Sequence, residues 1–199
     1  MNKVKQNWLV VGIILLALIL DQASKVYVKT HFELGETVDV FSWFKIRFLE
    51  NNGMAFGIEW FSKLLLTLFR IVAVGVMSWY VHTMIHKQEV RTGYLVTIAM
   101  VMAGALGNII DCVFYGKIWD YAGWFHGRVV DMLYFPLVEW NWPDWLPWIG
   151  GDHFIFFQPI FNVADAALSV GVILLILFYS KNFYQQEVDE SKSDSESKK

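Results

Sequence analysis

The feature that most constrains this chain is a carboxylate placed inside a long apolar run. The run extends from Phe161 to Tyr179, begins FNVADAALSVGV, and carries Asp165 a few residues from its start. An ionised Asp at the centre of a membrane-spanning helix costs about 2.5 to 3.5 kcal/mol, so such a residue usually faces protein or water and is a candidate for function. A polar residue that merely joins two helices is the competing interpretation, and other polar groups at the same depth disfavour it.

The composition is that of a small integral membrane protein. Of 199 residues, 56% are hydrophobic, and the mean hydropathy of +0.41 exceeds that of an ordinary soluble domain. The net charge of −3 and the dispersed Lys and Arg residues give no basis for nucleic-acid binding. Cys112 is the single cysteine, so an internal disulfide is impossible.

Four apolar segments are long enough to cross a bilayer, at about 8–28, 61–81, 93–115 and 160–180. The first follows two lysines, lacks a small-residue cleavage site and continues its helical pattern through DQASK, which indicates an uncleaved signal anchor. Basic residues beside both termini and in the short second loop predict cytoplasmic termini. The expected fold is a membrane α-protein, a four-transmembrane-helix bundle over 1–181 with a disordered cytoplasmic tail at 182–199.

Both larger loops then lie outside the cytoplasm. Alternating apolar residues within 38–48 predict a short strand or two, and the NNG sequence at 51–53 predicts a turn on the membrane surface. The 117–157 loop is too long for a bundle connection and holds six of the ten tryptophans. Its aromatic content argues against disorder and predicts a surface at the membrane interface.

The polar residues of the spans are expected at one membrane depth. The spans alternate in direction and rise about 1.5 Å per residue, which brings these groups to the outer boundary. Asp21 and Lys25 are four residues apart on one helix face and can pair, and Gly104 with Gly107 permits close helix packing. The convergent groups are Asp21, Lys25, Arg70, Asn108, Asp111, Asn162 and Asp165, with Asp131 in the outer loop.

Several carboxylates at one depth favour acid–base chemistry. Two carboxyl groups a few ångströms apart share a proton, so that one activates water and the other protonates the leaving group. Because Asp21 has Lys25 as a partner, the candidates for such a pair are Asp111, Asp131 and Asp165, and the residues alone do not select among them. His82 and His86 have a metal-ligand spacing without a nearby third ligand, so no metal site is predicted.

At this point the motifs resemble those of signal peptidase II, the lipoprotein signal peptidase of bacteria. The matching blocks are DQASK at 21–25, NNGMAF at 51–56, GALGNIIDC at 104–112, VVDML at 129–133 and FNVADAALSVG at 161–171. The resemblance implies a multi-pass aspartyl endopeptidase of the inner membrane with its active site at the outer leaflet. Its substrates would be diacylglyceryl-modified prolipoproteins, cleaved before the lipidated cysteine.

Carried over by position, Asp131 and Asp165 resemble the catalytic dyad. Substrate-binding or site-shaping roles fall by resemblance to Asp21, Lys25, Asn51, Gly53, Gly107, Asn108, Asp111, Asn162 and Ala164. The resemblance implies no metal or organic cofactor. It implies membrane lipid as a partner, and cyclic peptide antibiotics of the globomycin type as molecules that occupy the site.

The third block, at 104–112, departs from the family's pattern at one position. The family usually has Arg after the Asp of this block, where the chain has Cys112. We hypothesise that Arg70 or Arg128 supplies that charge.

Three other functions compete with this interpretation. An ion- or proton-coupled transporter predicts polar groups through both leaflets and commonly an internal repeat, which the sequence lacks. A non-catalytic assembly or anchoring protein predicts that Asp131→Asn and Asp165→Asn are nearly silent. A Cys112 nucleophile would need an activating histidine, and none is placed near it in the sequence.

Overall fold

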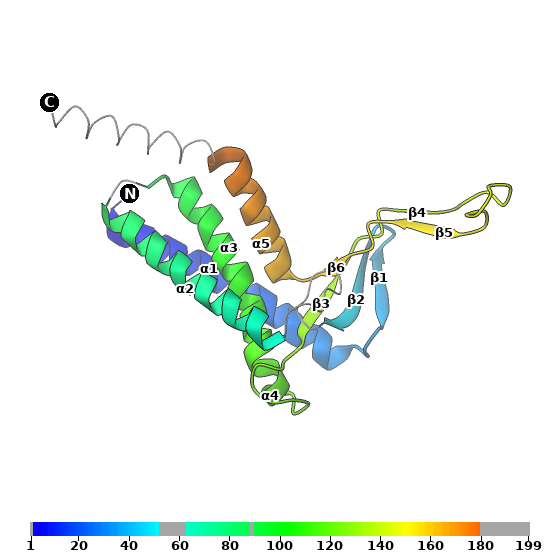
Figure 1. The fold of residues 1–199 in the computed structure, drawn as a ribbon, viewed down its shortest axis with the longest axis horizontal. Helices are drawn as coiled ribbons and strands as arrows, with labels where there is room; N and C mark the ends of the chain where they lie inside the picture. The colour runs from blue at the N-terminus through cyan, green and yellow to red at the C-terminus, as the bar shows by residue number, and fades with distance from the viewer. Residues whose placement is uncertain (1, 52–62, 88–89, 180–199) are drawn as a thin grey trace.

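The fold is a bundle of apolar helices with a small antiparallel sheet at one end (Figure 1). The structure is a computed structural model that describes residues 2–51, 63–87 and 90–179. Within these residues, three helical segments are long and apolar enough to cross a membrane: Lys3–His31, Lys63–Lys87 and Thr92–Ile118. A shorter apolar helical segment spans Val163–Tyr179. The prediction of a mainly helical membrane protein with a small β-rich part is confirmed.

The helices differ from the predicted spans mainly at their ends. Helix α1 (Lys3–His31) and helix α2 (Lys63–Lys87) both continue beyond the apolar runs, so that His82 and His86 lie in the last turns of α2 rather than in a loop. Helix α3 (Thr92–Ile110) passes into the π-helix η2 (Asp111–Tyr115) and the short helix α4 (Gly116–Ile118). Helix α5 (Val163–Leu174) is followed by the π-helix η3 (Leu175–Tyr179).

Helix α3 is the centre of the bundle and contacts α1, α2 and α5. Glycines set its approach to α5. A Cβ on Gly104 would lie 2.3 Å from the Ala164 carbonyl oxygen, and one on Gly171 would lie 2.7 Å from a Val101 methyl group. The predicted packing role of the glycine pair at 104 and 107 is therefore confirmed, since side chains here would push α5 away from α3.

The main sheet has the strand order β1-β2-β3-β6, with antiparallel pairing throughout. Strands β1 (Thr37–Phe41) and β2 (Phe44–Asn51) lie where the alternating pattern predicted them. Strand β3 (Val129–Tyr134) is the most buried, and β6 (Ile160–Phe161) leads directly to α5. The predicted turn at 51–53 lies outside the described residues except for Asn51.

An apolar cluster fixes this sheet on the end of the bundle. Val28 of α1 and Tyr115 of η2 pack against Phe48, Val130 and Met132 of the sheet. Asp131 lies between Val130 and Met132 on β3, so the same cluster determines the position of its carboxyl group.

The tryptophan-rich loop contains more regular structure than the sequence predicted. Besides β3 it forms a separate antiparallel hairpin of strands β4 (Val138–Asn141) and β5 (His153–Phe156). This hairpin extends away from both the bundle and the main sheet (Figure 1).

Candidate active site

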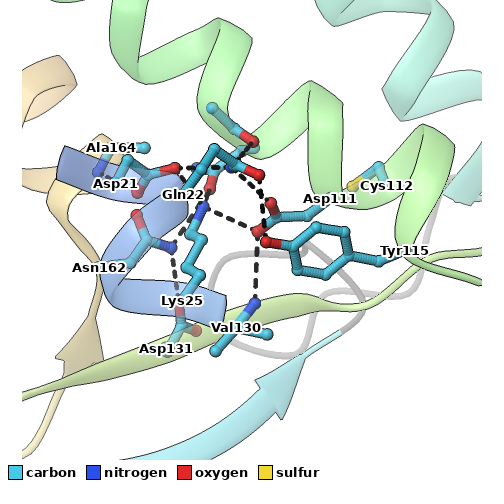
Figure 2. A network of polar contacts seen from close by, with 12 residues as sticks. Asp21, Gln22, Lys25, Asp111, Cys112, Tyr115, Val130, Asp131, Asn162 and Ala164 are labelled. Atoms are coloured by element: carbon cyan, nitrogen blue, oxygen red, sulfur yellow. Dashed lines mark hydrogen bonds and ion pairs between the residues drawn. The ribbon is translucent and has the colours of Figure 1, made fainter. Parts of the chain in front are cut away.

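A buried lysine bridges two carboxylates at the sheet end of the bundle. Lys25 Nζ lies 2.8 Å from Asp21 Oδ2 and 2.7 Å from Asp111 Oδ2, and all three side chains are almost fully buried. Figure 2 shows the ammonium group directed between the two acids. The predicted Asp21–Lys25 pair is confirmed. Lys25 also pairs with Asp111, so both acids, and not Asp21 alone, have a lysine partner.

Gln22 is a member of this cluster that sequence reasoning missed. Its Nε2 donates to Asp21 Oδ2 (3.0 Å) and Asp111 Oδ1 (2.9 Å), and its Oε1 accepts from the Tyr115 hydroxyl (3.1 Å). The available signal was its position in DQASK, since residues 21, 22 and 25 lie on adjacent parts of one helix face. Gln22 thereby supplies a hydrogen-bond donor to each of the two buried carboxylates.

A chain of amide side chains joins Asp131 to Asp165. Asn162 Nδ2 donates to Asp131 Oδ1 at 2.7 Å and to Asn108 Oδ1 at 3.2 Å. Asn108 Nδ2 donates in turn to Asp165 Oδ1 at 2.7 Å, while its oxygen accepts from Lys25 Nζ at 3.1 Å. The two carboxyl groups are thus held in one network that also reaches Lys25.

The local structure of α5 explains the position of Asp165. Asn162 is the N-cap of this helix and accepts from the Asp165 amide at 2.8 Å, while Asp165 Oδ2 accepts from the Asn162 amide at 3.3 Å. This reciprocal capping box fixes both side chains at the start of the helix. A carboxylate there is also favoured by the partial positive charge of the helix N-terminus.

Asp131 lies on β3 with its side chain enclosed by protein. Burial of the carboxyl group, together with the nearby charge of Asp165, raises the pKa of Asp131 to about 7, against the lowering effect of hydrogen bonds from Asn162 and Asn51. Near neutral pH this carboxyl group can therefore hold or release a proton, and Asp165 is close enough to influence which it does.

Close contact between α3 and α5 connects the lysine cluster to Asp165. The Ala164 amide donates to Asp21 Oδ1 at 2.9 Å. A Cβ on Gly107 would lie 2.6 Å from Asp21 Oδ2 and 2.8 Å from the Ala164 Cβ. Glycine is thus required at 107 if α5 is to hold Asp165 beside Asn108.

The two arginines considered as substitutes for the absent guanidinium lie in different places. Arg70 of α2 directs Nη1 to 3.8 Å from Cys112 Sγ. Arg128 pairs with Glu50 (3.2 Å) and stacks on Tyr121, with its side chain about half exposed. Arg70 is therefore the arginine whose charge lies beside Cys112.

The structure brings together most of the residues singled out from the sequence: Asp21, Lys25, Asn51, Gly107, Asn108, Asp111, Asp131, Asn162, Ala164 and Asp165. Gly53 lies outside the described residues. The rings of His82 and His86 are in tilted contact at the opposite end of α2. Within the described ranges, no group of three or more His, Cys, Asp or Glu side chains is arranged to hold a metal ion.

Comparison with known proteins agrees with the motifs. The family model described as signal peptidase (SPase) II matches residues 13–181. A lipoprotein signal peptidase of Porphyromonas gingivalis is 44% identical, with 91% of this chain and 87% of that protein covered. One of Amoebophilus asiaticus is 37% identical, with 87% and 78% covered. A solved structure described as a bacterial membrane enzyme superposes with a TM-score of 0.64 at 26% identity, covering 87% of this chain and 88% of its own. The chain therefore belongs to the signal peptidase II family.

Proposed function

We propose that this protein is an intramembrane aspartyl endopeptidase that removes signal peptides from diacylglyceryl-modified prolipoproteins, with cleavage before the lipidated cysteine. Family membership supports signal-peptide removal from lipoproteins. The observation that carries the aspartyl mechanism is the amide-linked pair of Asp131 and Asp165. The competing carboxylates Asp21 and Asp111 are both engaged by Lys25.

The environments of the two acids suggest a division of roles. Asp131 is buried and has a raised pKa, so it is the member that holds the shared proton. Asp165, less buried and at a helix N-terminus, takes a proton from water as the water oxygen adds to the scissile carbonyl carbon. Asp131 gives its proton to the carbonyl oxygen. The resulting diol then collapses: the C–N bond breaks, Asp165 passes its proton to the leaving amine, and Asp131 recovers a proton from a hydroxyl group.

The remaining residues orient this pair and its substrate. Asn51 and Asn162 donate to the two oxygens of Asp131, and Asn108 donates to Asp165. The buried Asp21–Lys25–Asp111 cluster fixes α1 and α3 beside the dyad. We assign Gly53, Arg70 and Arg128 to the substrate-binding side of the site, with Arg70 supplying the charge absent at Cys112.

The topology follows from the same placement. We propose four spans, with the segment beginning at Val163 as the fourth, both termini in the cytoplasm and the sheet outside it. The membrane domain covers 1–181 and the cytoplasmic tail 182–199. The dyad then lies at the outer leaflet of the bacterial inner membrane, where the lipid anchor of a prolipoprotein resides. Cyclic peptide antibiotics of the globomycin type are expected to occupy the same site.

The other functions fit the geometry less well. A transporter needs polar groups along a path through the bilayer, whereas the buried charged residues of the described helices gather at one end. A Cys112 nucleophile would need an activating base, whereas the Arg70 guanidinium that lies beside its sulfur is a donor that cannot accept a proton.

The test is cleavage of a diacylglyceryl-modified prolipoprotein by purified protein in detergent, followed as a gel shift. Asp131→Asn and Asp165→Asn should abolish the shift while both proteins stay folded and monodisperse. Asp39→Asn, at an exposed position on β1, is the matched control and should cleave normally. Cleavage that survives either dyad substitution would remove that residue from the mechanism. If neither substitution affected cleavage, the anchoring function would be favoured.

A further inference from the structure

The β4–β5 hairpin has two chemically different faces. Side chains alternate between the faces of a strand, and the register pairs Val138 with Phe156 and Trp140 with Phe154. These four side chains make one face of β4 and β5 apolar, and Trp142, just after β4, extends it through ring contacts with Trp140 and Phe154. We call this set of five residues the aromatic face.

The opposite face carries Ile155 and three polar residues, Glu139, Asn141 and His153, which contact one another. His153 Nδ1 lies 2.7 Å from Asn141 Oδ1, and His153 Nε2 lies 3.9 Å from Glu139 Oε2. Glu139 also lies 3.8 Å from Lys45 Nζ of β2, which ties this face toward the main sheet. The polar side chains of this face therefore have partners within the protein, whereas much of the aromatic face is exposed: Val138, Trp140 and Phe156 are all accessible.

The tip of the hairpin increases this apolar exposure. Trp145 is 78% exposed and Trp148 is 98% exposed. Trp148 also adopts a positive φ of 70°, a conformation that costs energy for a bulky side chain. A two-stranded hairpin is only marginally stable alone in water. A contiguous exposed aromatic surface on a projecting hairpin is typical of a binding surface.

The position of the aromatic face relative to the spans indicates what covers it. A row of ring contacts runs from Trp43 and Phe44 through Phe135 to Phe161 and on to Phe157, which directly follows β5. Phe161 precedes the N-cap of α5, the apolar helix that starts beside the dyad. The row therefore connects the base of the hairpin to the level at which α5 enters the apolar layer.

The charge of the hairpin also indicates which kind of surface covers its aromatic face. The hairpin segment 136–157 contains Glu139, Asp144 and Asp152 and no Lys or Arg, so it is not attracted to an acidic surface through ion pairs. Tryptophan prefers the boundary between headgroups and acyl chains, where its ring is in the apolar layer and its N–H meets water. We propose that the β4–β5 hairpin is a membrane-binding arm whose aromatic face and tryptophan tip lie in the headgroup–acyl boundary of the bilayer that holds the helices.

Site-directed spin labelling tests this arrangement in proteoliposomes of zwitterionic lipid. Cys112 is almost completely buried, and unsubstituted protein provides the labelling background. Nitroxides are placed through Phe156→Cys on the aromatic face, Trp148→Cys at the tip, and Asn141→Cys on the polar face as the matched control. We expect the ratio of collisions with oxygen to collisions with a water-soluble nickel chelate to be severalfold higher at positions 156 and 148 than at 141, and unchanged by salt.

The other outcomes overturn the proposal. High nickel accessibility at all three positions would place the hairpin in water. Shielding of position 156 from both reagents would indicate that protein covers the aromatic face. If the shielding disappeared at a higher lipid-to-protein ratio, the cover would be a second copy of this chain. If it disappeared with salt, the cover would be a basic polypeptide. The readout does not involve peptide cleavage, so it stands apart from any failure of the proposed peptidase function.

Discussion

At the residue scale, Lys25 is the charge whose removal the site tolerates least. It is completely buried and balances Asp21 and Asp111, which are themselves buried. Lys25→Met leaves two uncompensated carboxylates, and breaking a buried ion pair in this way typically costs about 3 to 5 kcal/mol. We expect a large fall in the unfolding midpoint in detergent.

Lys45→Met is the control for that measurement. Lys45 pairs with Asp39 at 3.5 Å, and the Asp39 side chain is 72% exposed, so the pair should contribute less than about 1 kcal/mol. If the two substitutions lowered the midpoint equally, the buried cluster would not be the stabilising centre described above.

The raised pKa of Asp131 predicts the pH dependence of cleavage. In its proposed role as the acid, Asp131 must carry its proton, which it does below its pKa of about 7 and loses as the pH rises through that value. We therefore expect kcat/KM to fall above about pH 7, by about tenfold per pH unit for the loss of one proton. A rate that rises steadily through this range would contradict the assignment of Asp131 as the acid.

A substitution of Asn51 tests whether Asp131 causes the fall in kcat/KM above about pH 7, which is the descending limb of the pH profile. Its amide donates to Asp131 and favours the ionised carboxylate, so its loss should raise the pKa of Asp131 further. Asn51→Leu is expected to lower activity and to move the descending limb to higher pH. Asn141→Leu on the exposed hairpin strand is the control and should leave the limb in place. A limb that is identical in both variants would show that another group titrates.

At the scale of elements, the contact between α3 and α5 determines whether the dyad forms. A Cβ on Gly104 would meet the Ala164 carbonyl oxygen at 2.3 Å and the Leu168 Cβ at 2.7 Å. Gly104→Ala should therefore separate the helices, weaken the Asn108–Asp165 hydrogen bond and lower both kcat and the unfolding midpoint. Gly75→Ala on α2 is the control, because nothing lies within 4 Å of its added Cβ. Equal behaviour of the two variants would contradict the packing argument.

A swap between α2 and η2 tests the source of the missing guanidinium. Arg70 and Cys112 are in contact across these elements. Arg70→Gln should reduce kcat/KM, and adding Cys112→Arg to that variant should restore part of the loss by returning the charge to the family's usual position. Arg128→Gln, which disrupts a partly exposed pair with Glu50, should have the smaller effect. Activity that is insensitive to Arg70 would remove it from the site.

The sequence predicted the elements that depend on local pattern and missed those that depend on tertiary contacts. The spans follow from apolar runs and β1–β2 from alternation, because lipid and a half-buried sheet impose those patterns directly. The π-helix at Asp111 left no such pattern. Asp111 was kept as a candidate for the acid pair because its partner, Lys25, comes from another helix. Sequence reasoning missed Gln22 because its partners are spread over α1, α3 and η2.

At the scale of the whole molecule, a fixed site and a projecting arm are joined through few contacts. The dyad is held by the bundle and the main sheet, whereas β4 and β5 pair only with each other in the described sheets and extend away from both (Figure 1). The ion pair between Glu139 and Lys45 is one connection, at 3.8 Å and partly exposed. The arm should therefore be removable without loss of the catalytic geometry.

Excision of the arm separates catalysis from membrane engagement. Replacing 139–155 by an Asn-Gly turn retains Val138 and Phe156 as the paired ends of a short hairpin. We expect an unchanged unfolding midpoint and unchanged cleavage in detergent, because the dyad network lies elsewhere. In proteoliposomes, kcat/KM for a lipid-anchored substrate should fall, since the arm would no longer hold the sheet against the bilayer over the dyad. The matched control keeps the arm and replaces Asp152 with Asn, a polar change that leaves the aromatic face intact. An equal loss in detergent and in bilayers would instead mean that the hairpin supports the site directly.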